Sequence, residues 1–304
     1  HRDFISLDPL LVREGAQVIG TVGDAVARLL DAGRMRDVVL DAFEDDPALV
    51  LCDNPECADC VMQRWRIWRE RLEHETFTLS ALAGSISPWP DEIAAECARA
   101  GVYDLVIDRL YGLPVWRVEP LRLSRAMTAF RDEGISVGAI YASPDPEQLA
   151  DCARLAGAMS TSSLVLAMPP APQRLVDAAE QQGVQVFFEN GRQTSAMCAR
   201  LLSEVETASA LCFNPAAFAM MGEKPFLQSY TQTPLRHRIG ILMLSDATFG
   251  GSHTVPARGN GEVKELLSIL RCKSFRGRVV LGTGPGGPGF REILGAFQDM
   301  MSSI

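Results

Sequence analysis

The sequence lacks the features that mark membrane, secreted and nucleic-acid-binding proteins. No apolar run approaches the roughly 20 residues needed to span a bilayer, and no basic and then apolar segment at the amino terminus indicates a signal peptide. Positive charge is scarce, because 29 Lys and Arg stand against 38 Asp and Glu, for a net charge of -9. Duplex binding depends on cation contacts to phosphates. We therefore expect a cytoplasmic protein that binds neither nucleic acid nor a membrane.

The sequence also lacks a G-x-G-x-x-G motif after its first predicted strand, so a dinucleotide-binding fold has little support. From Thr76 onward, short apolar runs alternate with amphipathic helical runs, which is typical of βαβ units with a parallel sheet. Eight such cycles favour a closed (β/α)8 TIM barrel over an open doubly wound sheet. The predicted strands are Phe77–Leu82, Leu105–Asp108, Val137–Tyr141, Ser163–Ala167, Gln185–Glu189, Ala210–Asn214, Ile239–Leu244 and Arg278–Leu281. The predicted helices are Pro90–Ala100, Glu119–Glu133, Pro146–Met159, Ala171–Gln182, Arg192–Glu206, Gly261–Arg271 and Phe290–Met300.

Residues 1–75 show no strand–helix alternation. Helical periodicity runs through Gln17–Leu30 and Arg36–Phe43, and Val61–Glu73 has the pattern of a further helix. We therefore predict two domains in an α/β protein: a helical, cysteine-bearing appendage over residues 1–75 and a TIM barrel over residues 76–304.

Three of the eight cysteines cluster in the predicted appendage. Cys52, Cys57 and Cys60 have C-x4-C-x2-C spacing in a polar, turn-rich segment. Thiolates at this spacing can hold zinc or an iron–sulfur cluster if a fourth ligand joins them. The alternative is a set of free or redox-active thiols, and a disulfide framework is disfavoured in a chain of this size without secretory features. The other five cysteines stand singly in apolar patterns, and we expect them to be buried: Cys97, Cys152, Cys198, Cys212 and Cys272.

Two residues are the predicted catalytic candidates. The run Val184–Gly191 is apolar until it ends in Glu189, as a buried parallel strand does where it leaves a sheet. Side chains at the carboxyl ends of barrel strands face the site, so Glu189 is the first candidate. The alternative is that Glu189 only caps the following helix. His253 follows the seventh predicted strand on the same side, where it could act as a ligand or proton donor.

The order of motifs between Phe77 and Gly284 resembles the xylose isomerase-like barrel superfamily, which includes sugar isomerases, sugar-phosphate epimerases and endonuclease IV. Each motif alone is weak, and the ordered set is fairly specific. The motifs are Ala100–Val106, Phe187–Asn190, Cys212–Ala217 with Gly222–Pro225, Leu244–Asp246, Val255–Val263 and Phe275–Leu281.

The resemblance implies a divalent metal at the ends of strands five to eight, held by carboxylates and a histidine or glutamine. It also implies that two glutamates move protons. Glu189 matches this set, but the other positions fall on Asn214, Met243 and Gly282. A hard cation requires several anionic oxygens, so we expect weak or no binding of a divalent metal in the barrel.

The last predicted strand is followed by a glycine-rich loop, Gly282–Gly289. Loops at this place in such barrels often bind phosphate on exposed backbone N–H groups, and Arg258, Arg192 and Arg109 are candidate charge partners. The alternative is that glycine and proline only turn the chain tightly here. The predicted substrate-binding residues are Asn214, Asp246, Arg258, Gly284, Gly286 and Gly287.

Two functions from different classes remain open. The first is a sugar or sugar-phosphate isomerase or epimerase that acts on a small polar carbonyl compound, with Glu189 as the base and with or without a phosphate group on the substrate. The second is a non-catalytic barrel of the same fold that binds a ligand or partner. Cleavage of DNA at abasic sites is disfavoured, because it requires three metal ions and a basic surface.

Overall fold

The computed structural model describes residues 11–14, 17–21, 76–143, 145–205, 211–284 and 286–303. Near the amino terminus it shows one antiparallel hairpin, in which β1 (Leu11–Glu14) pairs with β2 (Gln17–Thr21). The helix predicted from Gln17 is therefore wrong at its start, because three of the five residues in β2 are β-branched and favour an extended backbone. The rest of the predicted appendage lies outside the described residues.

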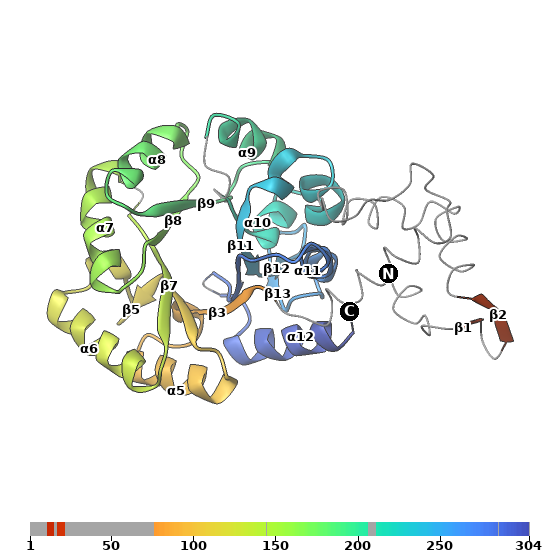
Figure 1. Ribbon diagram of the computed structural model, residues 1–304, viewed down its shortest axis with the longest axis horizontal. Helices are drawn as coiled ribbons and strands as arrows, with labels where there is room; N and C mark the ends of the chain where they lie inside the picture. The colour runs from red at the N-terminus through yellow and green to blue at the C-terminus, as the bar shows by residue number, and fades with distance from the viewer. Residues whose placement is uncertain are drawn as a thin grey trace. The chain divides into compact units, whose positions relative to one another are not determined.

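Eight parallel strands form the closed barrel that the sequence predicted, and helices surround it (Figure 1). Each strand pairs with the next barrel strand along the chain, and the last pairs with the first in the register Arg278↔Thr78. The strands are β3 (Thr78–Leu82), β4 (Asp104–Ile107), β7 (Ser136–Tyr141), β8 (Ser163–Ala167), β9 (Gln185–Glu189), β10 (Leu211–Phe213), β11 (Ile239–Leu244) and β14 (Arg278–Leu281).

The helices begin and end where the sequence provides suitable residues. Four of them start at proline, whose fixed φ and missing N–H suit the first turn. Gly101 follows the first of these helices in the left-handed region, at a φ of 68°. The helices are α5 (Pro90–Ala100), α6 (Pro120–Asp132), α7 (Leu149–Ala158), α8 (Pro172–Glu180), α9 (Ser195–Leu202), α10 (Pro215–Met220), α11 (Val263–Cys272) and α12 (Phe290–Ser302).

Four features of the fold were not predicted from the sequence. The helix α10 and the π-helical turn Pro225–Tyr230 follow β10. Two short hairpins also extend from strand ends: β5 (Arg109–Leu110) with β6 (Leu113–Pro114), and β12 (Asp246–Ala247) with β13 (His253–Thr254). In the part of the chain that the structure describes, no helix combines the length and apolar character needed to cross a membrane.

The middle of the barrel is packed with apolar side chains from all eight strands. Side chains alternate along a strand, so every second residue faces inward. This layer closes the interior and separates the two ends of the barrel from each other. Its members are Leu82, Val106, Ala139, Val165, Phe187, Cys212, Ile241, Met243 and Val280.

A polar layer closes the amino-terminal end of the barrel. The Arg278 guanidinium donates to Asp104 at 2.8 Å, and both side chains are mostly buried. Ser80 and Ser136 also donate to the Asp104 carboxylate. A side chain at Gly138 would collide with Asp104 and Arg278, so glycine makes room for this ion pair. This end of a barrel contributes to stability, and the chemistry belongs at the other end.

Candidate active site

The carboxyl ends of the barrel strands surround a cavity of about 690 Å³. Its floor consists of the inward-facing residues that lie one step above the apolar layer, because the alternation of each strand continues past its last paired residue. Seven strands contribute such a residue to the cavity: Asp108, Tyr141, Ala167, Glu189, Asn214, Ser245 and Gly282. The eighth, β3, contributes Leu82 from the layer below.

Glu189 lies on this floor, as predicted, and two neutral donors hold its carboxylate. The Tyr141 hydroxyl donates to Oε2 at 3.0 Å, and the Asn214 amide donates to Oε1 at 2.7 Å. Burial raises the pKa of the Glu189 carboxyl, the two hydrogen bonds act in the opposite direction, and the charge of Asp108 raises the pKa further. A carboxylate with a raised pKa is a stronger base than an exposed one.

The surrounding hydrogen bonds fix the orientation of the Asn214 amide. Its Oδ1 accepts the Ala217 backbone N–H at 3.2 Å and the Ser245 hydroxyl at 2.8 Å. A backbone N–H can only donate, so the amide oxygen must face Ala217 and the amide nitrogen must face Glu189. Asn190, which is fully buried, accepts from the Asn214 N–H and donates to its carbonyl, which ties β9 to β10 beyond their paired residues.

Asp108 brings a second carboxyl to the cavity, at the end of β4. Its Oδ1 accepts the Gly84 N–H at 2.8 Å, and the Arg109 Nε lies 3.8 Å from Oδ2. Burial raises the pKa of Asp108, while the backbone N–H groups around it and the Arg109 charge lower it by a smaller amount. Two carboxyls with raised pKa values therefore line one cavity from different strands.

The hairpin of β12 and β13 places His253 on the cavity wall. Its Nδ1 is buried and has no hydrogen-bond partner among the described residues. His253 was predicted on this side, and the structure brings it to the same cavity as Glu189.

Asp246 does not line the cavity. It is fully buried, and its carboxylate accepts the backbone N–H groups of Ala247, Gly259 and Gly261 at 2.7 to 2.9 Å. These bonds organise the loop that carries His253, so the role of Asp246 is to hold the loop. Arg258 is exposed on that loop and is likewise not among the residues of the cavity wall.

The predicted glycine loop is divided between two spaces. Gly284 lines the main cavity, whereas Gly286 and Gly287 line a smaller adjoining space of about 210 Å³ together with Asp108 and Arg109. The Glu292 carboxylate accepts the Gly289 N–H at 3.0 Å and so places an anion at the start of α12. The carboxylates of Asp108 and Glu292 both reduce the attraction of this loop for a phosphate dianion, so the structure favours a turn here.

The rest of the cavity wall combines an apolar side with a cationic rim. Trp116, Met220 and Met221 contribute apolar surface, and the exposed side chains of Arg109 and Arg192 lie at the mouth. Such a cavity suits a small molecule that has both an apolar face and polar groups.

The residues that are present do not fit the divalent metal that the superfamily resemblance implies. Glu189 already accepts from Tyr141 and from the nitrogen side of Asn214, and the Asn214 oxygen faces Ala217 and Ser245. A side chain at Gly282 would collide with Leu82, so the closing carboxylate has no room there. Among the described residues no group of three or more His, Cys, Asp or Glu side chains could hold a metal ion. The donor set therefore does not match a site for a divalent metal ion.

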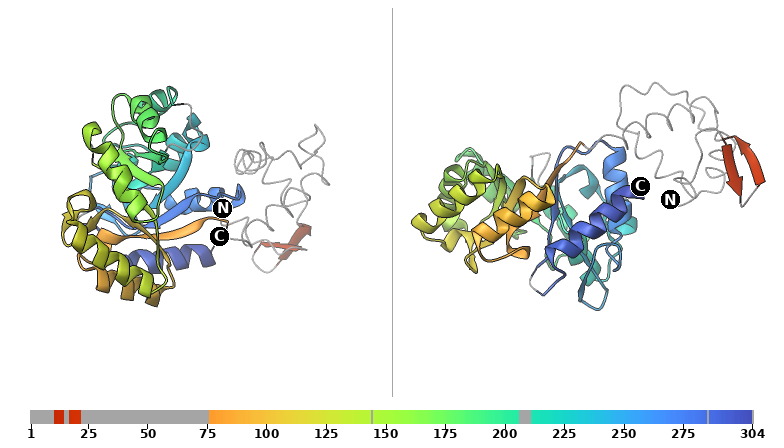
Figure 2. Two further views of the ribbon diagram at one scale, coloured as in Figure 1. Left: turned by 60° about the vertical axis from the view of Figure 1, so that its left-hand side comes forward. Right: turned by 90° about the horizontal axis from the view of Figure 1, so that it is seen from below.

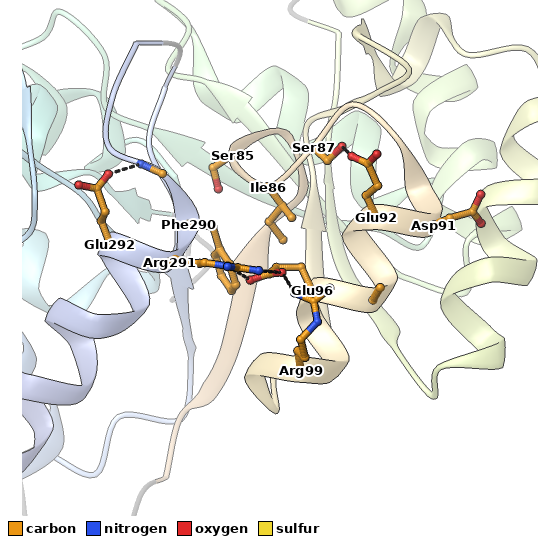
Figure 3. A pocket seen from close by; sticks show the side chains of 12 residues that line it. Ser85, Ile86, Ser87, Asp91, Glu92, Glu96, Arg99, Phe290, Arg291 and Glu292 are labelled. Atoms are coloured by element: carbon orange, nitrogen blue, oxygen red, sulfur yellow. Dashed lines mark hydrogen bonds and ion pairs between the residues drawn. The ribbon is translucent and has the colours of Figure 1, made fainter.

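A second hollow, of about 710 Å³, lies outside the barrel between α5 and α12. These two helices are far apart in the sequence but lie side by side (Figure 2). The charged groups in this hollow bind one another: Arg291 donates twice to Glu96, at 2.6 and 2.8 Å, and Ser87 donates to Glu92 (Figure 3). Although this hollow is slightly larger, most of its charged groups are already paired, so the barrel cavity is the better candidate for chemistry.

Tyr141 and Asp108 are the functional candidates that the sequence reasoning missed. Both lie at the ends of predicted strands, so the strand-end rule that selected Glu189 could have found them as well. Their partners are distant in sequence, however: Tyr141 meets Glu189 over 48 residues and Asp108 meets Gly84 over 24. The five cysteines that were predicted to be buried are all buried free thiols. The predicted metal ligands Cys52, Cys57 and Cys60 lie outside the described residues.

No family model and no curated protein matches the sequence. Solved structures do share its fold. The probable 3-DHS dehydratase AsbF from Bacillus anthracis is 14% identical at a TM-score of 0.58, over 74% of this chain and 99% of that one. A xylose isomerase domain protein from Planctomyces limnophilus is 12% identical at a TM-score of 0.56, over 75% of this chain and 96% of that one. The 3-keto-D-glucoside 4-epimerase YcjR from E. coli is 12% identical at a TM-score of 0.54, over 74% of this chain and 99% of that one. The barrel therefore has the xylose isomerase-like TIM fold, which confirms the fold that the motif order implied.

Proposed function

We propose that the barrel is an enzyme of the isomerase and epimerase class that moves a proton next to the carbonyl group of a small polar compound, without a metal ion. The observation that carries the proposal is the state of Glu189. Its carboxylate faces the cavity, is held by two neutral donors, and has a raised pKa. A raised pKa makes this carboxylate a stronger proton acceptor than an exposed glutamate, which favours its use as a general base.

The residues around Glu189 have distinct roles in this reaction. Tyr141 and Asn214 fix the carboxylate, which limits the reorganisation needed when a C–H proton is removed. Arg192 follows three residues later on the same loop and lines the cavity, where its N–H groups can bind the substrate oxygen that gains charge. His253 contributes a further polar group on the wall.

The charges in the cavity also favour a particular substrate class. Asp108 and Glu189 disfavour a phosphate dianion, and Glu292 already caps the helix that follows the glycine loop. The apolar surface of Trp116 and Met220 suits one face of a ring or short carbon chain. An uncharged or singly anionic hydroxyketone fits this wall best. One structural neighbour is a 3-keto-D-glucoside 4-epimerase, which agrees with this choice of chemistry.

Solvent deuterium provides a test that does not require the natural substrate. The protein is incubated in D2O with EDTA and a 2-ketohexose, a 3-keto-D-glucoside or dihydroxyacetone, and proton NMR follows loss of the C–H signal next to the carbonyl. We expect exchange in at least one probe, and Glu189→Gln should slow it about 10²-fold or more. Glu133→Gln is the matched control, because Glu133 is exposed and lies at the end of α6, away from the cavity.

The second candidate function is a barrel that binds its ligand without turnover. It is favoured by the two donors that already satisfy Glu189. A probe that raises the melting temperature of the protein but exchanges no proton would support this function and overturn the enzyme proposal. Exchange that needs added Mn²⁺ and stops with EDTA would overturn the metal-independent mechanism.

A further inference from the structure

Asp108 and Glu189 reach the same cavity from separate parts of the barrel wall. Asp108 follows β4 and Glu189 ends β9, and in the closed strand order β7 and β8 lie between these two strands on one side. On the other side β3, β14, β11 and β10 lie between them. A small molecule bound in the cavity therefore has one carboxyl on each of two different sides.

Asp104 and Asp246 are buried and do not line the cavity, whereas Asp108 is partly exposed and lines it. The Asp104 carboxylate accepts hydrogen bonds from the Arg278 guanidinium at 2.8 Å and from two serine hydroxyls. The Asp246 carboxylate accepts hydrogen bonds from three backbone N–H groups. Asp108 accepts the Gly84 N–H, the backbone N–H groups of Asp108 and Arg109 also act on its carboxylate, and the Arg109 guanidinium is 3.8 Å away with a half-exposed side chain. An ion pair this long and this exposed contributes little to the stability of the fold.

The local backbone is shaped around this carboxyl. A Cβ at position 84 would lie 2.5 Å from the Asp108 Oδ2, so only glycine leaves space for the carboxyl in its position. The Gly84 N–H then orients the carboxyl toward the space shared by the main and the smaller cavity. The Asp108 carboxyl is thus oriented by the backbone and still lines the open cavity.

The surroundings of both carboxyls also favour their protonated forms. Burial raises both pKa values, and the charge of Asp108 raises the pKa of Glu189 further. Because the pKa of each carboxyl is raised, either of them carries a proton more readily than an exposed carboxyl does.

We propose that Asp108 is the second proton-transfer group of the site and that the reaction inverts a carbon centre next to the carbonyl, an inference that rests on the proposed function. Glu189 takes the proton as the C–H bond breaks, and the electron pair moves to the carbonyl oxygen. Protonated Asp108 then gives its proton to the same carbon from the other face as the new C–H bond forms. The product is the epimer, and the two carboxyls return to their starting states by proton exchange with water.

The test uses the full chain in D2O with a 2-ketohexose and a 3-keto-D-glucoside of defined configuration as probes. Wild-type protein should produce an epimer that carries solvent deuterium. In Asp108→Asn, epimer formation should fall about 10²-fold or more, whereas deuterium should still enter the starting isomer through Glu189. Asparagine keeps an acceptor oxygen for the Gly84 N–H, and a urea unfolding curve verifies that the variant is folded. Asp132→Asn, at an exposed position of α6, is the matched control.

The outcomes separate this proposal from the one it rests on. If Asp108→Asn forms the epimer within about threefold of the wild-type rate, the role of Asp108 is overturned while the proposed function stands. If folded Asp108→Asn loses both epimer formation and exchange, a separate second step is also overturned. If wild-type protein exchanges no proton in any probe, the function of Glu189 fails and the role of Asp108 fails with it.

Discussion

Replacing Asn214 by aspartate exchanges a hydrogen-bond donor for a second carboxylate beside Glu189. In the wild-type protein the amide nitrogen lies 2.7 Å from the Glu189 Oε1. At that separation, and with an effective dielectric constant of about 20, two negative charges repel each other by about 6 kcal/mol. The remaining bonds of Asn214 are preserved, because an aspartate oxygen can still accept from Ala217 and Ser245.

Taking up a proton is the less costly response to this repulsion. For a carboxyl with the ordinary pKa of 4.5, binding a proton at pH 7 costs about 3 kcal/mol. We therefore expect Asn214→Asp to be destabilised by about 3 kcal/mol at pH 7. The folded variant holds one more proton than the unfolded chain in this range, so its stability falls as pH rises and recovers as pH falls toward 5.

Urea unfolding at pH 5, 7 and 8 measures this effect. Asn260→Asp is the matched control, because its Oδ1 accepts the Phe249 N–H at 3.0 Å and Asn260 does not line the cavity. Two adjacent carboxylates also attract a divalent cation, so millimolar Mn²⁺ should stabilise Asn214→Asp and change the wild type little. Equal stability of Asn214→Asp and wild type at pH 8 would refute the hydrogen bond from Asn214 to Glu189. A micromolar Mn²⁺ affinity of the wild type that is lost in Glu189→Ala would refute the metal-independent site.

Three further predictions follow from the charges and packing. Gly138→Ala should lower the free energy of unfolding by about 1 to 3 kcal/mol, because the new methyl group meets Asp104 and Arg278; a change below about 0.5 kcal/mol in urea would contradict this packing. Burial raises the pKa of Glu189, so the stability of the wild type should fall as pH rises through that pKa, and Glu189→Gln should be the more stable protein at pH 8. The melting temperatures of both proteins at pH 5 and pH 8 test this prediction. The same change in melting temperature between the two pH values for wild type and variant would disprove it. If Cys52, Cys57 and Cys60 hold zinc, the purified protein should contain about one equivalent, whereas elemental analysis that finds none beside three titratable thiols would favour the alternative of free thiols.

The repeat of apolar strand and amphipathic helix in the sequence was sufficient to predict the barrel. Four of the eight strands have the predicted bounds, including β9 (Gln185–Glu189), and the other four differ by one residue at one or both ends. This accuracy has a physical reason, because a strand buried on both sides must be apolar over its length and must end where polar residues begin. The same reasoning identified Glu189 as a residue of the site. It failed for α10, whose six residues are too few to show helical periodicity.

Only the tertiary structure decided what each polar strand end does. Asp246 and Asp108 look alike in sequence, since Asp108 directly follows an apolar strand and Asp246 follows another after one serine. In the fold, Asp246 turns into its own loop and binds three backbone N–H groups, whereas Asp108 faces the cavity beside Gly84. The sequence alone determined that carboxylates stand at the open end of a barrel. Which of them remain free for chemistry depends on hydrogen bonds that form only when distant segments are folded together.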